Sequence, residues 1–299
     1  MLSSQSITMK TFIKISIAII VFGMTHICQK VNASDAKDKA WPTDIIAQIG
    51  ELEIRLESRS FWTLYRVQFR GKKLGLDSWG SHYGHVAKFQ GIGFVGSGHT
   101  ENEDEKLISK KLFVDGKAVS NPKKNYKSRK SIKLIKKSQI RNLEIDSELE
   151  VFSDRFIEDV KIKALKPEKL DFMLLFMHPW NTSFSDYAVL DKGHEKTGKF
   201  TDSKAVKVNK AVRKVTLFNK ELNSAIVTII TLIPQGEDWN NQYWDYPKRY
   251  RKHYFKIFKN RTIIPGKSYH FRAITVLFET NKEEWIQKAK QICNSIKIK

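Results

Sequence analysis

Histidines and an acid lie among glycines in the first of four stretches whose residue types could do chemistry. His82, His85, His99 and Glu101 fall in or beside a segment with six glycines between residues 80 and 98. An imidazole titrates near neutral pH, so it can act as an acid, a base or a metal ligand. Glycine at this density predicts a tight loop that approaches a ligand closely. We interpret the four polar residues as ligand-binding.

A divalent ion is the alternative ligand for this stretch. His82, His85 and His99 are residue types that bind metals, with Glu101 nearby. Their spacing, however, matches no strong metal-binding signature. We therefore expect no metal and no other cofactor.

The second stretch places a histidine at the end of an apolar run. His178, Pro179 and Trp180 follow residues 170–177, which read as a strand. A histidine at a strand end, held by proline and flanked by tryptophan, is well placed to face a cleft. We interpret His178 as an acid or base and Trp180 as a ligand contact. The alternative for Trp180 is that it covers a sheet edge.

The third stretch mixes aromatic rings with amides and carboxylates. Residues 239–247 include Trp239, Tyr243 and Trp244. Aromatic faces can cover the C–H faces of a pyranose ring while amides and carboxylates bind its hydroxyl groups. The composition therefore predicts a sugar-binding surface, and the alternative is again a covered sheet edge.

Cations and phenols alternate in the fourth stretch, which contains Arg249, Arg251, His253 and Tyr254. A guanidinium group can pair with a carboxylate or sulfate through two hydrogen bonds. We interpret Arg249, Arg251 and Tyr254 as binding residues and His253 as a second acid or base. The alternative for His253 is a structural histidine with satisfied hydrogen bonds.

Positive charge is concentrated in two blocks of the chain. The sequence has 53 Lys+Arg against 32 Asp+Glu, a net charge of +21, and no acid lies between Asp115 and Glu144 or between Asp245 and Glu279. Such fields attract polyanions. Acidic polysaccharides or anionic cell surfaces are therefore the expected partners, and the alternative is a solvated basic surface that binds nothing.

The first 33 residues have the pattern of a secretory signal peptide. Lys10 and Lys14 precede a short apolar run, and Val31-Asn32-Ala33 forms a small-residue cleavage site. The run is too short to span a bilayer, so we expect no transmembrane span, a secreted or periplasmic protein, and no nucleic-acid partner. The alternative is a retained N-terminal anchor. Removal of the segment would take Cys28 with it, and Cys293 alone could form no intrachain disulfide.

Most of the remaining chain reads as strands with one wet face. In residues 51–57, for example, leucine and isoleucine alternate with charged residues, which is the antiparallel pattern. Asp115-Gly116 between two apolar segments predicts a hairpin turn. We predict one all-β domain over residues 41–299, a two-layer antiparallel sandwich, with residues 121–131 as an exposed loop.

One amphipathic helix is predicted at the C-terminus. Asn281 can cap it, with Glu284 as the capping-box partner, and apolar residues from Trp285 to Ile296 recur at helical spacing. We expect its apolar stripe to pack on the edge of the sheet.

Three segments together resemble the galactose mutarotase-like β-supersandwich of aldose epimerases, glycoside hydrolases and polysaccharide lyases. They are Ser138–Val151, Phe156–Ile162 and the long strand that ends in His178-Pro179-Trp180-Asn181. The resemblance implies that His178 is the catalytic acid, through a loose match to the motif Asn-His-x-Tyr-Phe-Asn-Leu. It implies Glu279 as the general base. Gly84–Phe89 lacks the second arginine and the asparagine of the family's early Gly-Arg-x-x-Asn-Arg segment.

The expected function is that of an exported carbohydrate-active protein that acts on or binds an acidic glycan. If it is an enzyme, His178 and His253 would do acid–base work, while Tyr254, Arg251 and His82 would bind or neutralise substrate charge. With a uronate this would be lyase chemistry. A glycoside hydrolase and a sugar epimerase stay open. The alternatives are a non-catalytic module that binds glycan or cell surface and a structural envelope protein.

Overall fold

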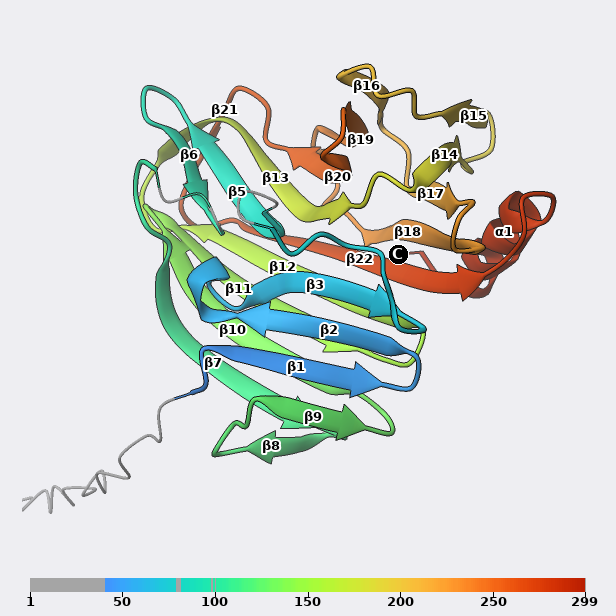
Figure 1. The fold of residues 1–299 in the computed structure, drawn as a ribbon. Coiled ribbons are helices and arrows are strands. Elements are labelled where there is room, and N and C mark those ends of the chain that lie inside the picture. The colour runs from blue at the N-terminus through green and yellow to red at the C-terminus, as the bar shows by residue number, and fades with distance from the viewer. Residues whose placement is uncertain (1–40, 79–81, 98, 100, 299) are drawn as a thin grey trace, which may run out of the picture. The chain divides into compact units, whose positions relative to one another are not determined.

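The computed structural model describes residues 41–78, 82–97, 99 and 101–298. The predicted signal peptide, its alternative as an anchor, and Cys28 lie outside these residues. Contacts group Lys39–Lys299 into one compact unit. This part of the chain forms three sheets, a short 3-10 helix and a C-terminal α-helix. Figure 1 shows their arrangement.

The N-terminal sheet has five strands in the order β4-β3-β2-β1-β9. All neighbours are antiparallel except β1 and β9, which are parallel. The short 3-10 helix η1 (Ser58–Ser60) connects β2 to β3. The strands are β1 (Asp44–Ile49), β2 (Leu52–Glu57), β3 (Thr63–Phe69), β4 (Lys72–Lys73) and β9 (Asn125–Ser128).

The largest sheet has ten strands in the order β15-β14-β17-β18-β22-β12-β11-β10-β7-β8, all antiparallel. The hairpin predicted at Asp115-Gly116 joins β7 to β8, and both turn residues have positive φ angles, 49° and 81°. The strands are β7 (Lys106–Val114), β8 (Lys117–Val119), β10 (Ile132–Ile140), β11 (Leu143–Val151), β12 (Arg155–Ala164), β14 (Phe184–Val189), β15 (Lys196–Lys199), β17 (Lys214–Asn219), β18 (Ser224–Leu232) and β22 (Ser268–Glu279).

The third sheet has seven strands, with the order β16-β19-β20-β13-β5-β6 and β21 paired to β13. Its central pairs are antiparallel, with bulges in β13. The strands are β5 (Gly84–Phe89), β6 (Gly93–Gly96), β13 (Glu168–Trp180), β16 (Ala205–Lys210), β19 (Trp239–Tyr246), β20 (Tyr250–Ile257) and β21 (Arg261–Ile263).

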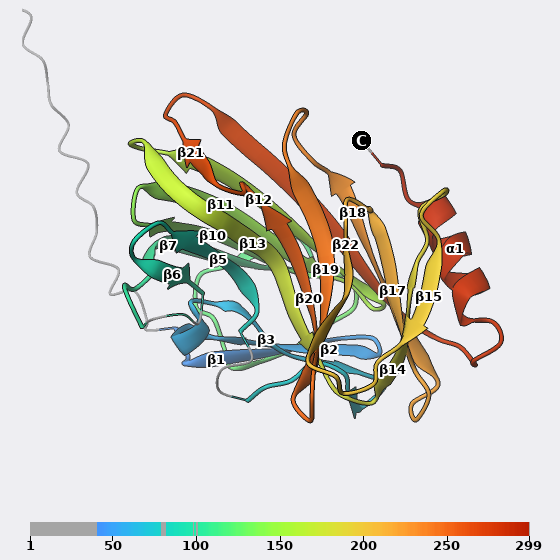
Figure 2. The ribbon, with the colours of Figure 1, turned by 90° about the horizontal axis from the view of Figure 1, so that it is seen from above.

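The five-stranded and seven-stranded sheets both pack on the ten-stranded sheet, as Figure 2 shows from above. Ile54 and Val67 of the small sheet share a core with Leu134 of β10. Met173 and Phe255 of the seven-stranded sheet share another core, in which residues of β12 and β22 take part. The predicted two-layer all-β sandwich is therefore confirmed, with one layer divided into two sheets.

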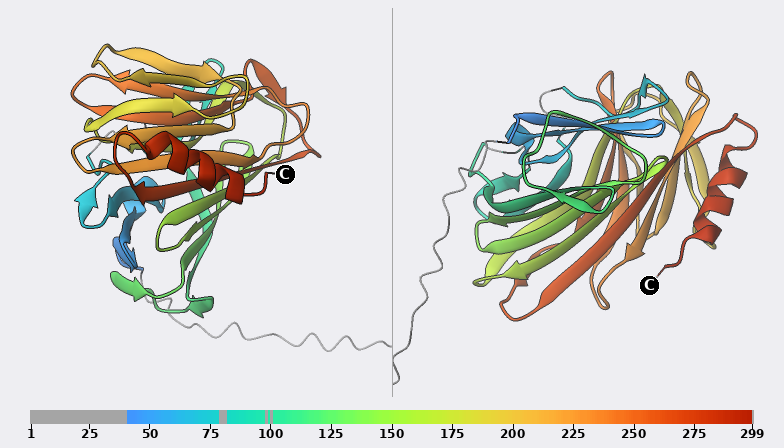
Figure 3. Two further views of the ribbon diagram at one scale, coloured as in Figure 1. Left: turned by 90° about the vertical axis from the view of Figure 1, so that its right-hand side faces the viewer. Right: turned by 90° about the horizontal axis from the view of Figure 1, so that it is seen from below.

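Helix α1 (Trp285–Ser295) is the predicted C-terminal amphipathic helix. The predicted cap was wrong in position, because Glu284 is the N-cap residue of α1 and the helix has no side-chain cap hydrogen bond. The Oδ1 atom of Asn281 instead accepts a hydrogen bond of 2.9 Å from the Glu284 backbone N–H, in the turn before the helix. The expected edge position was wrong. The helix covers β17 and β18, the third and fourth strands of the ten-stranded sheet counted from β15, and Trp285 stacks on Phe218 (Figure 3, red helix). The helix buries the side chains that β17 and β18 carry on the face turned away from the other two sheets.

Two segments that were predicted as loops contain strands, and the third and fourth chemical stretches are also strands. The glycine-rich segment includes β5 and β6, because Gly84, Gly93 and Gly96 occupy positions with positive φ or close contact, such as Gly96 beside the His85 carbonyl. The third and fourth stretches are β19 and β20, and residues 121–131 contain β9. Their polar, aromatic or glycine-rich composition concealed these strands.

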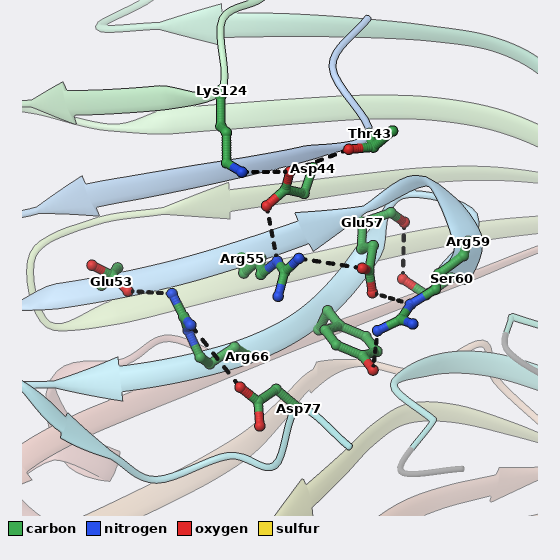
Figure 4. Close-up of polar contacts among 11 residues, drawn as sticks. Thr43, Asp44, Glu53, Arg55, Glu57, Arg59, Ser60, Arg66, Asp77 and Lys124 are labelled. Atoms are coloured by element: carbon green, nitrogen blue, oxygen red, sulfur yellow. Dashed lines mark hydrogen bonds and ion pairs between the residues drawn. The ribbon is translucent and has the colours of Figure 1, made fainter. Parts of the chain in front are cut away.

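A network of ion pairs covers the solvent face of the small sheet (Figure 4). Arg55 bonds to Asp44 at 3.0 Å and to Glu57 at 3.3 Å, and Glu57 also bonds to Arg59 at 2.7 Å. Asp44 and Glu57 are buried beneath these cations. In the part of the chain that the structure describes, no helix has the length and apolar character needed to cross a membrane.

Candidate functional site

Strand β20 divides the predicted site residues between two faces. Successive side chains of a strand point to opposite sides of a sheet. Arg251 and His253 point to the inner face, toward the ten-stranded sheet, with Phe255 of the shared core. Lys252 and Tyr254 point to the outer face, which is turned away from that sheet.

On the inner face the structure brings the two predicted catalytic histidines together. His178 and His253 are directly paired on β13 and β20, with ring centroids 5.6 Å apart, and both are 0% exposed. The Nε2 atom of His178 lies 2.7 Å from the Glu158 carboxylate. Burial and the neighbouring His178 lower the pKa of His253 to about 3, so His253 is neutral at pH 7.

His253 is held at both ring nitrogens. Its Nδ1 atom lies 3.0 Å from the Phe176 carbonyl oxygen, and its Nε2 atom lies 2.8 Å from Oδ1 of Asn241. The Asn241 amide donates to the Val212 carbonyl at 2.6 Å, which fixes its orientation. Both partners are hydrogen-bond acceptors. A neutral imidazole carries one N–H, so neutral His253 can donate to only one of them.

Several polar atoms of the inner face have no partner within the described residues. These are Nδ1 of His178, Nε1 of Trp180 and the hydroxyl of Tyr243. Glu158 also lines a partly open cavity of about 40 Å³. One water molecule occupies about 30 Å³ in the liquid, so the cavity can take water and is too small for a sugar ring.

His85 belongs to a buried ion cluster at the other side of this cavity. The Glu105 carboxylate lies 2.9 Å from Nζ of Lys136 and 3.6 Å from Nε2 of His85. Burial alone would raise the pKa of Glu105, but Lys136 and His85 outweigh it and hold this pKa well below its usual value. Sequence reasoning missed both partners, because Lys136 looked like one more residue of a basic block.

Arg251 is committed to internal ion pairs. Its guanidinium group lies 2.6 Å from Asp245 and 2.7 Å from Asp202, and it is 4% exposed. Trp239 packs on Phe255 with ring centroids 5.7 Å apart. Arg251 is therefore not presented to a solvent ligand, whereas Trp239 is half-buried.

Glu279, the predicted base, is not brought together with the histidines. It ends β22 of the ten-stranded sheet, its side chain is exposed, and it pairs with Arg70. No contact joins it to His178 or His253 among the described residues.

Four aromatic rings cluster on the outer face. The ring of Trp244 lies 5.3 Å from Tyr246, 6.3 Å from Tyr250 and 6.4 Å from Tyr254, measured between centroids. Tyr246 and Tyr250 are 5.4 Å apart. Trp244 and Tyr246 are half-buried, so part of each ring faces solvent. Sequence reasoning missed Tyr246 and Tyr250, although alternation along the two strands places them with Trp244 and Tyr254.

Two cations accompany these rings. Nζ of Lys252 lies 5.3 Å from the centroids of Tyr250 and Tyr254, and the Arg249 guanidinium lies 5.5 Å from Tyr250. Lys252 also pairs with Trp244 across β19 and β20. Burial, and then the nearby Arg249, lower the pKa of Lys252 to about 7, so about half of these amines are neutral at pH 7.

An imidazole pair lies next to the cations. His82 and His99 are 4.1 Å apart between centroids, and Nδ1 of His99 lies 2.8 Å from the Glu101 carboxylate. Burial, His99 and Lys252 lower the pKa of His82 to about 3. The structure thus gathers six of the predicted residues on the outer face: His82, His99, Glu101, Trp244, Arg249 and Tyr254.

The proposed metal set is not assembled. His82 and His99 are on the outer face, whereas His85 is on the inner face with Glu105. Among the residues that the structure describes, no three histidine, cysteine or acidic side chains are grouped as a metal site requires. The absence of a cofactor stays a prediction.

The chain was compared with known proteins. No family model and no curated protein matches it. Similar solved structures include a galactose mutarotase-like protein from Lactobacillus casei, with 9% identity and a TM-score of 0.48, covering 79% of this chain and 100% of that one. This is the fold type that the sequence resemblance predicted.

Two larger proteins are also similar in structure. A heparan sulfate lyase from Pedobacter heparinus has 8% identity and a TM-score of 0.44, covering 77% of this chain and 34% of the lyase. An alpha-N-acetylgalactosaminidase from Bifidobacterium bifidum has 9% identity and a TM-score of 0.48, covering 84% and 38%. The chain thus spans about a third of the length of each enzyme, and at these identities the similarity concerns the fold.

Proposed function

We propose that the chain binds an acidic glycan on the outer face of its seven-stranded sheet. The observation that carries the proposal is the packing of Trp244, Tyr246 and Tyr250 with the exposed Arg249 on one face of β19 and β20. Aromatic rings can cover the apolar faces of sugar rings, and a guanidinium group can pair with a carboxylate or sulfate. A neutral sugar would not need the cation.

Access to solvent favours the outer face over the inner one. His178 and His253 are 0% exposed, and the neighbouring cavity has the volume of about one water molecule. Trp244, His82 and His99 are partly exposed, and Arg249 is exposed. We assign ligand contact to the outer residues and a supporting role to the inner histidines. The signal-peptide pattern supports a place of action outside the cytoplasm.

Binding to polygalacturonate tests this function, with dextran as the neutral control, at two ionic strengths. We expect binding to polygalacturonate that weakens with salt and little binding to dextran. Trp244→Ala and Arg249→Ala should each weaken binding by about tenfold. Trp41→Ala is the matched control, since Trp41 is also half-buried but packs against Trp62 on the other sheet. Equal losses in Trp244→Ala and Trp41→Ala would contradict the proposal.

Eliminative cleavage of a uronate chain is the second candidate function. Lys252 favours it, because burial lowers the pKa of its amine to about 7 beside the Tyr254 phenol. Lys252 is 2% exposed, so this reaction requires the surrounding rings to move and admit the sugar. Lys252 would take the proton from the carbon next to the carboxylate, and that electron pair would form the carbon–carbon double bond. The bond to the leaving oxygen would break, Tyr254 would protonate that oxygen, and Arg249 would hold the carboxylate.

Release of unsaturated products that absorb in the near ultraviolet tests the second candidate. We expect Lys252→Met to abolish this absorbance while leaving at least part of the binding. Absence of product from the unsubstituted protein, with binding intact, would identify a non-catalytic glycan-binding module.

A further inference from the structure

The structure divides the basic block of residues 117–141 into two parts. On β10 and just after it, the cations are paired with acids. Lys133 contacts Glu148 at 2.8 Å and Lys137 contacts Glu144 at 2.9 Å. Lys136 is buried against Glu105, and Arg141 is paired with Glu103 and Glu168. These four cations stabilise the fold, and their charge is already balanced.

The other six cations lie on β8, on β9 and next to them, and all are exposed. Lys124 pairs with Asp44 at 3.4 Å. The remaining five have no ion pair with any residue that the structure describes, and we call them the basic edge: Lys117, Lys123, Lys127, Arg129 and Lys130. Asp115 is the acid nearest to this edge, and its carboxylate accepts hydrogen bonds from Ser128 and from the backbone of Lys130 and Ser131.

The basic edge joins the borders of two sheets. Strand β8 is the last strand of the ten-stranded sheet and β9 is the last strand of the five-stranded sheet. Figure 1 shows both strands together, at the far side of the unit from β19 and β20. Lys117 lies on β8 and Lys127 on β9, while Lys123 precedes β9 and Arg129 and Lys130 follow it directly. The edge therefore gathers five exposed cations where the two strands meet.

The surroundings favour a soluble polymer over a membrane. Membrane-surface binding usually combines basic residues with inserted apolar side chains. The large apolar side chains with high exposure are Ile108, Ile135, Leu165, Val206, Ile264 and Ile298, and none of them belongs to residues 117–130. The edge offers charge without an apolar anchor.

We propose that the basic edge is a second binding surface, which holds a linear polyanionic polysaccharide by charge and lies apart from the outer-face site. The choice of a polysaccharide rests on the proposed function, whereas the binding of a polyanion rests on the unpaired cations themselves. A long acidic chain can contact both surfaces, and a short oligosaccharide can fill only the outer-face site.

The test compares two variants that lose the same charge. One changes all five residues of the basic edge to glutamine. The control changes five exposed lysines elsewhere to glutamine, none of which has an ion pair in the described part of the chain: Lys72, Lys163, Lys166, Lys196 and Lys220. Each variant is titrated with dextran sulfate, with long polygalacturonate and with a galacturonate tetramer over a range of salt concentrations.

We expect the basic-edge variant to lose at least about tenfold in affinity for both polymers and to show a weaker salt dependence. Its affinity for the tetramer should be unchanged, and the control variant should bind like the original protein. Equal losses in both variants would overturn the proposal, because net charge alone would then explain binding. Retained polymer binding with aggregation would also overturn it, since the lysines would then only protect edge strands.

A lipid partner is tested with vesicles that contain anionic phospholipids. Loss of vesicle binding in the basic-edge variant, with polymer binding unchanged, would overturn the polysaccharide assignment. If Trp244→Ala has no effect while the basic-edge variant loses the polymers, the outer-face site fails and the basic edge stands.

Discussion

Among the residues of the outer face, Lys252 is 2% exposed, and its Nζ atom lies 5.3 Å from the ring centroids of Tyr250 and Tyr254. Its pKa is lowered to about 7 in the folded protein from 10.5. Below pH 7 both the folded and unfolded states carry the proton, and the folded state bears the full cost of the buried charge. Between pH 7 and 10.5 the unfolded state binds more protons, so stability rises with pH.

Lys252→Met should therefore raise the free energy of unfolding by about 1–3 kcal/mol below pH 7. The difference in the free energy of unfolding between Lys252→Met and the original protein should shrink as the pH approaches 10. Urea unfolding at pH 6, 8 and 9.5 measures it, with Lys256→Met as a less buried control. A difference that does not change with pH would contradict the explanation.

The contact between Glu158 and His178 is a second feature that single substitutions can test. Glu158→Leu would leave His178 with no partner at either ring nitrogen within the described residues. We expect a loss of about 1–3 kcal/mol in the free energy of unfolding, measured with urea, and a smaller loss for Glu158→Gln. If His178→Asn keeps the fold but removes turnover, the supporting role assigned to the inner histidines is wrong.

At the scale of elements, β1 and β2 depend on the ion network of Figure 4. Arg55 is 26% exposed and covers two nearly buried carboxylates, those of Asp44 and Glu57. Arg55→Leu would leave both with fewer partners. We expect a loss of about 2 kcal/mol by chemical denaturation, and Arg55→Lys should lose less. An unchanged midpoint would show that Lys124 and Arg59 compensate.

The turn before α1 is held by the Asn281 side chain. Asn281→Ala removes that acceptor and should lower the free energy of unfolding by about 1 kcal/mol. Asn281→Asp keeps an acceptor and should be close to neutral. Thermal unfolding followed by circular dichroism compares the two variants, and equal losses would count against the role of this hydrogen bond.

At the scale of the whole described unit, one core joins the sheets. Ile54, Leu134 and Trp180 come from the five-, ten- and seven-stranded sheets and belong to the same buried cluster. We expect one unfolding transition, in which tryptophan fluorescence and far-ultraviolet circular dichroism change together. An earlier fluorescence transition, abolished by Trp62→Phe, would show that the small sheet unfolds separately.

Local pattern was enough to predict many elements and part of the site. Alternation predicted β2, Asp-Gly predicted the β7–β8 hairpin, and helical spacing predicted α1. The four chemical stretches also contained every predicted residue of the outer face. These features are local, because hydrophobic period and turn chemistry depend on residues close in sequence.

By itself, the sequence determined that cations, phenols and His253 follow one another in the fourth stretch, and that residues 117–141 are basic. Tertiary structure decided which face is covered, and therefore that His253 is internal while Trp244 and Arg249 reach solvent. It also decided which cations of the block meet an acid, because Lys133 and Lys137 find theirs on β11. A period of two separates two faces, but burial and ion pairing depend on strands that are distant in the chain.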